Sequence, residues 1–397
     1  MGGIKDFMVP FLIASFFLSI FFLPTLLLRT LPTTIANTAT AVSSARNFSE
    51  SFPVNFAYLV SASKGDVNKL TRVLYAIYHP ANYYLLHLDL EASEEERTRL
   101  WEFVSGNKIF AEFGNVWIVK KSNLVTYRGP TMLSNTLHSM AILLRTCKWD
   151  WFINLSASDY PVVTQDDMIF AFSKLPKQYN FIHHTSNLGW KLNKRAKPIV
   201  IDPGIYSKNK SNLIWASKER GAPDAFKLFT GSAWMALSRS FTEYCIIGWD
   251  NLPRTLLLYY TNFISSPEGY FQTVICNSKD HRNTTLNHDL HFVKWDNPPR
   301  QHPAILGSKD FRKMIISGAP FARKFKEGDP VLNKIDKEIL GRQKGKFTYS
   351  GWSAEMESGN WKNASVVIKN GAGGRRLKAL MSKISSAEQL GKRGQCR

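Results

Sequence analysis

Glu268 is the residue of this sequence best placed to act as a general base. It follows Pro267 in the segment SPEGYFQT, where the proline predicts the start of a helix with Glu268 in its first turn. The amino end of a helix keeps a carboxylate deprotonated, and such a carboxylate can remove a proton if it faces a cleft. A first-turn glutamate that only complements the helix dipole is the commoner case.

Arg323 and Lys324 form a basic pair between Phe321 and Phe325. Two cations flanked by aromatic rings could hold a pyrophosphate, although a basic pair is more often a surface feature. Trp234, in the segment KLFTGSAWMALSR, could form an apolar wall for a sugar or belong to the core.

Asp89 and Asp159 each follow a predicted strand. The aromatic run 149–155 has the composition of a central strand and ends at Ser156, Ser158 and Asp159. Ligands of parallel sheets bind beyond the carboxyl ends of the strands, so these residues either line a crevice or form an ordinary turn. The Asp89 carboxylate could contact a base or a ribose, or only cap a turn.

The order of elements needed to position these residues predicts an α/β fold with a doubly wound sheet. The predicted strands are 55–61, 83–88, 116–119, 149–155 and 181–184. The predicted helices with defined ranges are 67–77, 131–144, 165–175 (after Thr164) and 240–247. A further helix is expected to begin at the capping box of Ser93 and Glu96 and to end at 104, and another to end at 316. Residues 227–239 are expected to form a strand and a turn bent at Gly231.

The first 54 residues predict attachment to a membrane. Residues 9–28 are apolar and uncharged, long enough to span a bilayer as a signal anchor after a short cytoplasmic end, 1–8. Residues 29–54 are expected to form a stem that holds a lumenal body, 55–340, away from the membrane. A cleaved signal peptide is the alternative, and 341–397 would be an extension whose basic tail, 375–397, is poorly ordered or peripheral.

A formal net charge of +20 indicates an anionic partner or a solvated basic surface. Nucleic acid is not expected, because the sequence has neither zinc-finger spacing nor a basic run interleaved with aromatics. Acceptor sequons for glycosylation occur in polar segments at Asn47, Asn209, Asn283 and Asn363. A further sequon, at Asn154, lies in the central strand and is not expected to be modified.

Metal binding is not expected from the histidines and cysteines. His183 and His184 are adjacent in a predicted strand and therefore point to opposite faces. The four cysteines, Cys147, Cys245, Cys276 and Cys396, lack metal-ligand spacing. One disulfide is plausible in an oxidising lumen, but the sequence leaves its connectivity open.

The motifs taken in order resemble the core-2/I-branching glycosyltransferase family, which includes the protein xylosyltransferases. The likeness is greatest to its plant branch, the β-glucuronosyltransferases that act on type II arabinogalactan. It covers residues 55–340 and rests on FINLSASDYP, TGSAW, SPEGYFQT, WDNPPRQHP and GAPFARKF. Each motif alone is weak, but together and in this order they are a strong indication of the family.

This resemblance implies a GT-A-like fold, an inverting mechanism and a UDP-sugar donor. It makes Glu268 the catalytic base and places Val60 and Asp89 at the uridine end. The remaining donor-binding positions that it implies are Tyr127, Arg128, Asp159, Trp234, Arg300, Ser308, Arg323 and Lys324. Glucuronic acid is the preferred donor sugar by resemblance only, with N-acetylglucosamine or xylose as alternatives, and the acceptor would be a galactan or arabinogalactan.

The same resemblance implies a metal-independent enzyme of the Golgi membrane, single-pass and type II, with its catalytic domain in the lumen. Most GT-A enzymes hold a divalent metal with an Asp-x-Asp motif, whereas Ser156–Asp159 contains one acid, which makes a poor site for magnesium or manganese. Fixed cations can neutralise a leaving pyrophosphate instead. A non-catalytic carbohydrate-binding partner is the rival hypothesis, and the presence of Glu268 and of the cationic residues argues against it.

Overall fold

The computed structural model describes residues 51–207, 209–298, 302–352, 368–386 and 396. At the centre of this part lies a mixed sheet with strand order β10-β6-β9-β4-β1-β2-β3. Its strands are β1 (Phe56–Ala62), β2 (Tyr83–Leu88), β3 (Val116–Ile118), β4 (Trp151–Ser156), β6 (Asn180–Thr185), β9 (Thr230–Ser238) and β10 (Thr285–Leu286). Strand β9 runs antiparallel to β4 and β6, and the other pairs are parallel. This mixed sheet fits the expected GT-A-like fold.

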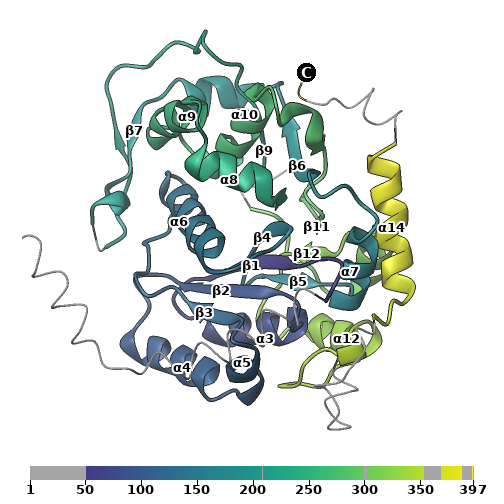
Figure 1. Cartoon of the computed structure of the whole chain (residues 1–397). Helices are drawn as coiled ribbons and strands as arrows, with labels where there is room; N and C mark the ends of the chain where they lie inside the picture. Colours follow the sequence, from purple (N-terminus) through teal and green to yellow (C-terminus); the bar gives the residue numbers. More distant parts are fainter. Residues whose placement is uncertain (1–50, 208, 299–301, 353–367, 387–395, 397) are drawn as a thin grey trace, which may run out of the picture.

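Apolar side chains of β1 alternate between two hydrophobic clusters, one on each face of the sheet. Phe56, Tyr58 and Val60 belong to one cluster, and Ala57 and Leu59 to the other. The first face is covered by α3 (Val67–Ile77), α4 (Glu94–Ser105), α5 (Lys108–Phe113), α7 (Gln165–Phe172) and α12 (Pro330–Glu338). The second is covered by α6 (Thr131–Thr146), α8 (Arg239–Ile247), α9 (Leu252–Thr261) and α10 (Tyr270–Asn277). Figure 1 shows α6 on one side of β1 and β2, and α3 to α5 on the other.

A small second sheet brings a late part of the chain to the end of β4. Its strand order is β11 (His291–Val293), β12 (Phe321–Arg323) and β5 (Asp159–Pro161). The turn η5 (Ser308–Asp310) and helix α11 (Phe311–Ile316) precede β12. Because β12 and β5 are antiparallel, the basic pair predicted from the sequence is carried to the segment that follows the central strand.

Residues 227–239 differ from the expected strand and turn, because most of them form the single strand β9. Gly231 makes no bend of the chain. A Cβ atom at this position would lie 1.7 Å from the backbone oxygen of His183, so the glycine is needed where β9 passes close to β6. The pairing of β6 with β9 is irregular between Ile182 and His184, beside this contact.

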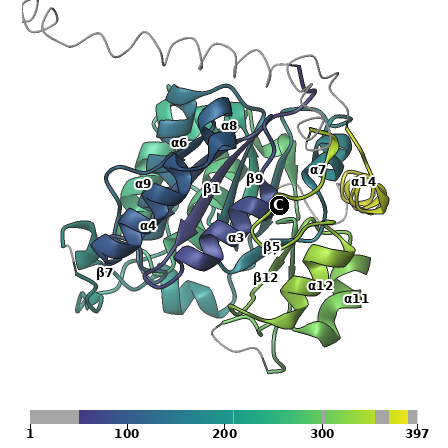
Figure 2. The same cartoon turned by 90° about the horizontal axis from the view of Figure 1, so that it is seen from below.

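The first part of the basic tail, which was expected to be poorly ordered or peripheral over residues 375–397, forms a helix at the periphery of the fold. Helix α14 (Ala372–Ile384) packs against α7, as both views show (Figures 1 and 2). Leu377 and Met381 are buried at this contact. These two apolar residues, four positions apart, form a buried stripe between the lysines and arginines and so agree with the peripheral alternative rather than with disorder.

Cys276 of α10 and Cys396 form a disulfide that crosses 120 residues of sequence. His184 lies beside it, and its Nε2 accepts a hydrogen bond from the backbone nitrogen of Cys396 at 3.2 Å. His183 is exposed on the other face of β6, in agreement with the expected opposite orientation. The two thiols near His184 are thus joined to each other rather than offered as metal ligands.

The predicted anchor, 9–28, and most of the predicted stem lie outside the described residues. Within the described residues, no helix combines the length and the apolar character that crossing a bilayer would require.

Candidate functional site

A cavity of about 280 Å³ lies beyond the carboxyl ends of β1, β2 and β4. Each of these strands contributes its last residues or the loop that follows it, and β9 and β12 close the remaining side. The lining includes Ser61, His87, Asp89, Tyr127, Ser156, Ser158, Trp234, Arg323 and Lys324. The structure therefore brings together Asp89, the tryptophan and the basic pair, as the sequence predicted, whereas Asp159 does not line the cavity and contacts its wall through Arg323.

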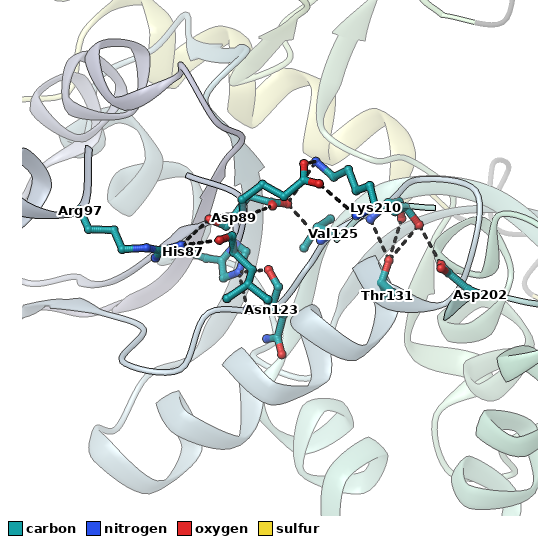
Figure 3. Close-up of polar contacts among 11 residues, drawn as sticks. His87, Asp89, Arg97, Asn123, Val125, Thr131, Asp202 and Lys210 are labelled. Carbon is teal, nitrogen blue, oxygen red and sulfur yellow. Dashed lines mark hydrogen bonds and ion pairs between the residues drawn. The ribbon is translucent and has the colours of Figure 1, made fainter. Parts of the chain in front are cut away.

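Asp89 makes the turn contacts that the sequence left open and also lines the cavity. Its Oδ1 accepts a hydrogen bond from the backbone nitrogen of Glu91, and its Oδ2 accepts one from Val125, each at 3.0 Å. These contacts organise the turn after β2 and the loop before α6 (Figure 3). Lys210 reaches Asp89 from the other side, with its Nζ 3.7 Å from Oδ2. The carboxylate is thus a turn residue that also lines the cavity.

His87 lies beside Asp89 in the cavity wall, and the sequence analysis assigned it no role. Burial lowers the pKa of His87 to about 4, so the imidazole is neutral at neutral pH. Its Nε2 lies 3.1 Å from the backbone nitrogen and 3.2 Å from the backbone oxygen of Asn123, and Figure 3 draws this contact. Among the described residues, Nδ1 is buried without a hydrogen-bond partner. A neutral imidazole nitrogen of this kind could contact a ligand in the cavity.

Arg323 connects Asp159 to Trp234. Its Nε lies 3.2 Å from Oδ1 of Asp159, and its Cζ lies 3.9 Å from the centre of the Trp234 ring. The other carboxylate oxygen of Asp159 accepts hydrogen bonds from the backbone nitrogen and the hydroxyl of Ser156, at 2.6 and 2.9 Å. A divalent metal does not fit this arrangement, because the one acid after the central strand is already held by a cation and two donors.

Glu268 occupies the turn η3 (Ser266–Glu268), immediately before α10, rather than the first turn of an α-helix. Its Oε2 lies 2.5 Å from Nη1 of Arg195 and 3.1 Å from Nζ of Lys191. The hydroxyl of Tyr127 donates a hydrogen bond to Oε1 at 2.8 Å. Since Tyr127 also lines the cavity, the expected base stands next to it.

Side chains, and not the helix dipole, account for the charge state of Glu268. Burial alone would raise its pKa, but the charges of Arg195 and Lys191 and the hydrogen bond from Tyr127 outweigh burial and hold the pKa below its ordinary value. The sequence analysis predicted a deprotonated carboxylate for another reason, the helix amino end. Arg195 and Lys191 must therefore move away or bind another anion before the Glu268 carboxylate is fully available as a proton acceptor.

Arg195 and Lys191 were missed by the sequence analysis, which predicted no helix or strand for residues 188–215. Arg195 lies in the π-helical turn η1 (Leu192–Ala196), and Lys191 directly precedes it. The spacing of four residues between the two cations was the available signal, but no periodic apolar pattern marked the turn. Beyond η1 the same segment forms β7 (Val200–Ile201), η2 (Pro203–Ile205) and β8 (Ile214–Trp215).

Comparison with known proteins assigns the chain to a family. The profile of the family described as "Branch: Core-2/I-Branching enzyme" matches residues 56–315. This chain belongs to the Core-2/I-branching enzyme family. It is a glycosyltransferase, as the resemblance of its motifs indicated.

The curated relatives include three proteins of Arabidopsis thaliana. Beta-glucuronosyltransferase GlcAT14A is 57% identical over 344 residues, which cover 85% of this chain and 77% of the relative. For Beta-glucuronosyltransferase GlcAT14B the identity is 56% over 347 residues, or 86% of this chain and 80% of the relative. Beta-glucuronosyltransferase GlcAT14C is 59% identical over 288 residues, which cover 72% of this chain and 74% of the relative.

Some positions implied by the family resemblance do not line the cavity of this glycosyltransferase. The Val60 side chain packs in the hydrophobic cluster under α3, and the β1 residues that line the cavity are Leu59, Ser61 and Ala62. Ser308 is exposed in η5. Arg128 is also exposed, and its backbone oxygen accepts a hydrogen bond from Ser265, which ties its loop to the turn of Glu268.

Other predicted positions concern the surface of the chain or lie outside the described residues. Asn209 and Asn283 are exposed, as a glycosylation acceptor must be. Asn154 is buried, and its side chain bonds the backbone of Ala233 and Met235, which agrees with the prediction that it is not modified. Arg300, Asn47 and Asn363 lie outside the described residues, and their roles stay predictions.

Proposed function

We propose that this glycosyltransferase transfers glucuronic acid from UDP-glucuronic acid to a galactan-type acceptor with inversion. The observation that carries the proposal is the position of the Glu268 carboxylate, beside a cavity whose lining includes Arg323 and Lys324. Three curated relatives named as beta-glucuronosyltransferases support the choice of donor. The galactan or arabinogalactan acceptor is inferred from the resemblance to the plant branch.

In the proposed reaction an acceptor hydroxyl attacks the anomeric carbon of the donor. The acceptor oxygen forms a bond to this carbon while the bond from the carbon to the UDP oxygen breaks, and Glu268 takes the hydroxyl proton. Attack opposite the leaving group converts an α-linked donor into a β-linked product. Arg323, Lys324 and the predicted Arg300 would meet the negative charge that develops on UDP.

We further propose that the reaction needs no divalent metal and takes place in the Golgi lumen. The metal-free mechanism is supported by the contacts that occupy Asp159, and the location by residues 9–28 and by the exposed sequons. Retention of the full-length protein in the membrane pellet after an alkaline carbonate wash tests the anchor. Secretion with a new amino terminus near residue 33 would instead identify residues 9–28 as a signal peptide.

The donor and the base are tested together with the purified lumenal body. We expect release of UDP from UDP-glucuronic acid when a β-galactan acceptor is present, and a weaker reaction with UDP-N-acetylglucosamine or UDP-xylose. Glu268→Gln should retain its fold and bind UDP but lose about a hundredfold to ten-thousandfold in rate. The control is Glu112→Gln, at an exposed carboxylate of α5.

Three results would contradict this proposal. Preferred use of another UDP-sugar would replace glucuronic acid as the donor. Turnover of Glu268→Gln within about tenfold of wild type would remove Glu268 as the base. A protein that binds galactan but releases no UDP with any donor would favour the non-catalytic alternative.

A further inference from the structure

Two cations contact the single carboxylate of Glu268. Arg195 and Lys191 both reach the same oxygen, Oε2, at 2.5 and 3.1 Å, while Oε1 is bonded by the neutral hydroxyl of Tyr127. The three charged side chains are shielded from solvent, with exposed fractions of 23%, 18% and 15% for Lys191, Arg195 and Glu268. The group thus carries one positive charge more than its carboxylate neutralises, at the edge of the ligand cavity.

We propose that Arg195 and Lys191 bind the carboxylate of the donor's glucuronosyl group and so determine the choice of a uronic acid donor. This inference rests on the proposed function. A second carboxylate would balance the second cation, whereas the hydroxymethyl group of a neutral hexose would leave it without a partner. An arginine fork and an ammonium group are the side chains best suited to bind a carboxylate.

Sugar stereochemistry places the carboxylate within reach of these residues. In a D-glucuronosyl group the C6 carboxylate and a β-substituent at C1 project from the same face of the ring. An acceptor hydroxyl that forms a β-linkage therefore approaches from the face on which the carboxylate lies. Because Glu268 must be next to that hydroxyl, side chains in contact with Glu268 are near the C6 carboxylate as well.

Both cations are held in place by groups other than Glu268. The Arg195 guanidinium lies over the Trp190 ring, with its Cζ 5.1 Å from the ring centre, and the Lys191 ammonium donates a hydrogen bond to Thr230 at 3.1 Å. They can therefore stay in the site when their contacts with Glu268 are exchanged for contacts with the donor. The exchange would return basicity to Glu268 once a uronic acid donor is bound. A neutral donor would leave the base paired with the cations.

The test compares UDP-glucuronic acid with UDP-glucose, which differ only at C6. For Arg195→Gln we expect the ratio of kcat/KM for the two donors to fall by about tenfold to a hundredfold, the range for a lost hydrogen bond to a charged group. Arg195→Lys should recover part of the ratio, and Lys191→Gln should lower it. Lys194→Gln, at an exposed cation of the same turn, is the matched control and should keep the wild-type ratio.

The ratio separates donor recognition from a structural role. If Arg195 and Lys191 only position Glu268, their variants will slow transfer from both donors equally, and an unchanged ratio would overturn the inference while the proposed function stands. If the wild type does not prefer UDP-glucuronic acid, both proposals fail. Circular dichroism and UDP binding of each variant identify losses that come from misfolding.

Discussion

Arg323 lies opposite Asp159 in the register of β12 and β5, and its Nε is 3.2 Å from Oδ1 of that aspartate. Two donors of Ser156 hold the other carboxylate oxygen. The charge of the acid after the central strand is therefore met within the protein. The guanidinium is at the same time fixed in the wall of the cavity, against the Trp234 ring.

The first prediction concerns metal. We expect transfer to persist in excess EDTA, because the Asp159 carboxylate is already occupied and fixed cations can neutralise the leaving UDP. Lys324→Ala should weaken UDP binding and slow transfer together, by removing one of those cations. UDP release measured with and without EDTA, and with added manganese, checks both expectations.

Lys326→Ala provides the control for the metal experiment, since Lys326 is exposed two residues beyond the basic pair. It should leave UDP binding unchanged. Loss of activity in EDTA that manganese restores would refute the metal-free mechanism. Rescue of Lys324→Ala by manganese would contradict the role assigned to that lysine.

The second prediction concerns acid stability and His87. The unfolded histidine titrates near 6.5, whereas burial lowers the folded pKa to about 4. Between these values the unfolded chain binds a proton that the folded chain does not, so stability falls as the pH is lowered. This site should contribute roughly 2 to 3 kcal/mol to the loss of unfolding free energy between about pH 7 and about pH 4.5.

Urea unfolding of wild type and His87→Asn at the two pH values measures this contribution. The variant should lose less stability on acidification, because asparagine does not titrate. His183→Asn, at an exposed histidine of β6, should behave as wild type. Equal acid sensitivity of wild type and His87→Asn would show that His87 does not contribute.

The sequence was sufficient to predict the helices and strands that are determined by residues close together in the chain. The ranges of α3 and β2 agree with the predicted 67–77 and 83–88, since an amphipathic repeat and an apolar run mark them. The capping box of Ser93 and Glu96 is present at the start of α4. The path of β9 was not predictable in the same way, because the close contact of Gly231 with β6 depends on a segment far away in sequence.

The candidate site was predictable where it follows strands. Asp89 and Ser156 lie at strand ends, and the general rule for α/β sheets places them at the cavity. Arg195 and Lys191 reach Glu268 across 73 and 77 residues of sequence, from a turn without an apolar pattern. Only the folded chain shows that these cations, rather than a helix dipole, surround the expected base.

The third prediction concerns the segment after α12. Arg342 is buried, and its Nη1 donates hydrogen bonds to the Tyr160 hydroxyl at 2.6 Å and to Asp336 at 2.8 Å. Arg342→Met removes one partner of a buried ion pair and should lower the unfolding free energy by about 3 to 5 kcal/mol. Urea unfolding measures the change, with Lys344→Met at an exposed position as the control.

A loss below about 1 kcal/mol for Arg342→Met would mean that solvent replaces the missing contacts. Residues 341–352 would then contribute little to the catalytic body. Asp336 would keep two partners, the Tyr160 hydroxyl at Oδ1 and Arg72, whose Nη2 lies 2.7 Å from Oδ2. Because neither of them replaces the buried guanidinium of Arg342, we expect these contacts to compensate only in part.

The last prediction concerns the disulfide of Cys276 and Cys396. The bond restricts the unfolded chain over a separation of 120 residues, so the double variant Cys276→Ser/Cys396→Ser should lose about 2 to 4 kcal/mol of unfolding free energy. Its kcat/KM per folded molecule should stay close to that of wild type, because Cys276 lies near the end of α10 that is remote from Glu268. Reductant should destabilise wild type by a similar amount and leave the double variant unchanged. Equal unfolding of oxidised wild type and double variant would show that the bond does not stabilise the fold, and a selective loss of kcat/KM would show that the chain end supports the turn of Glu268.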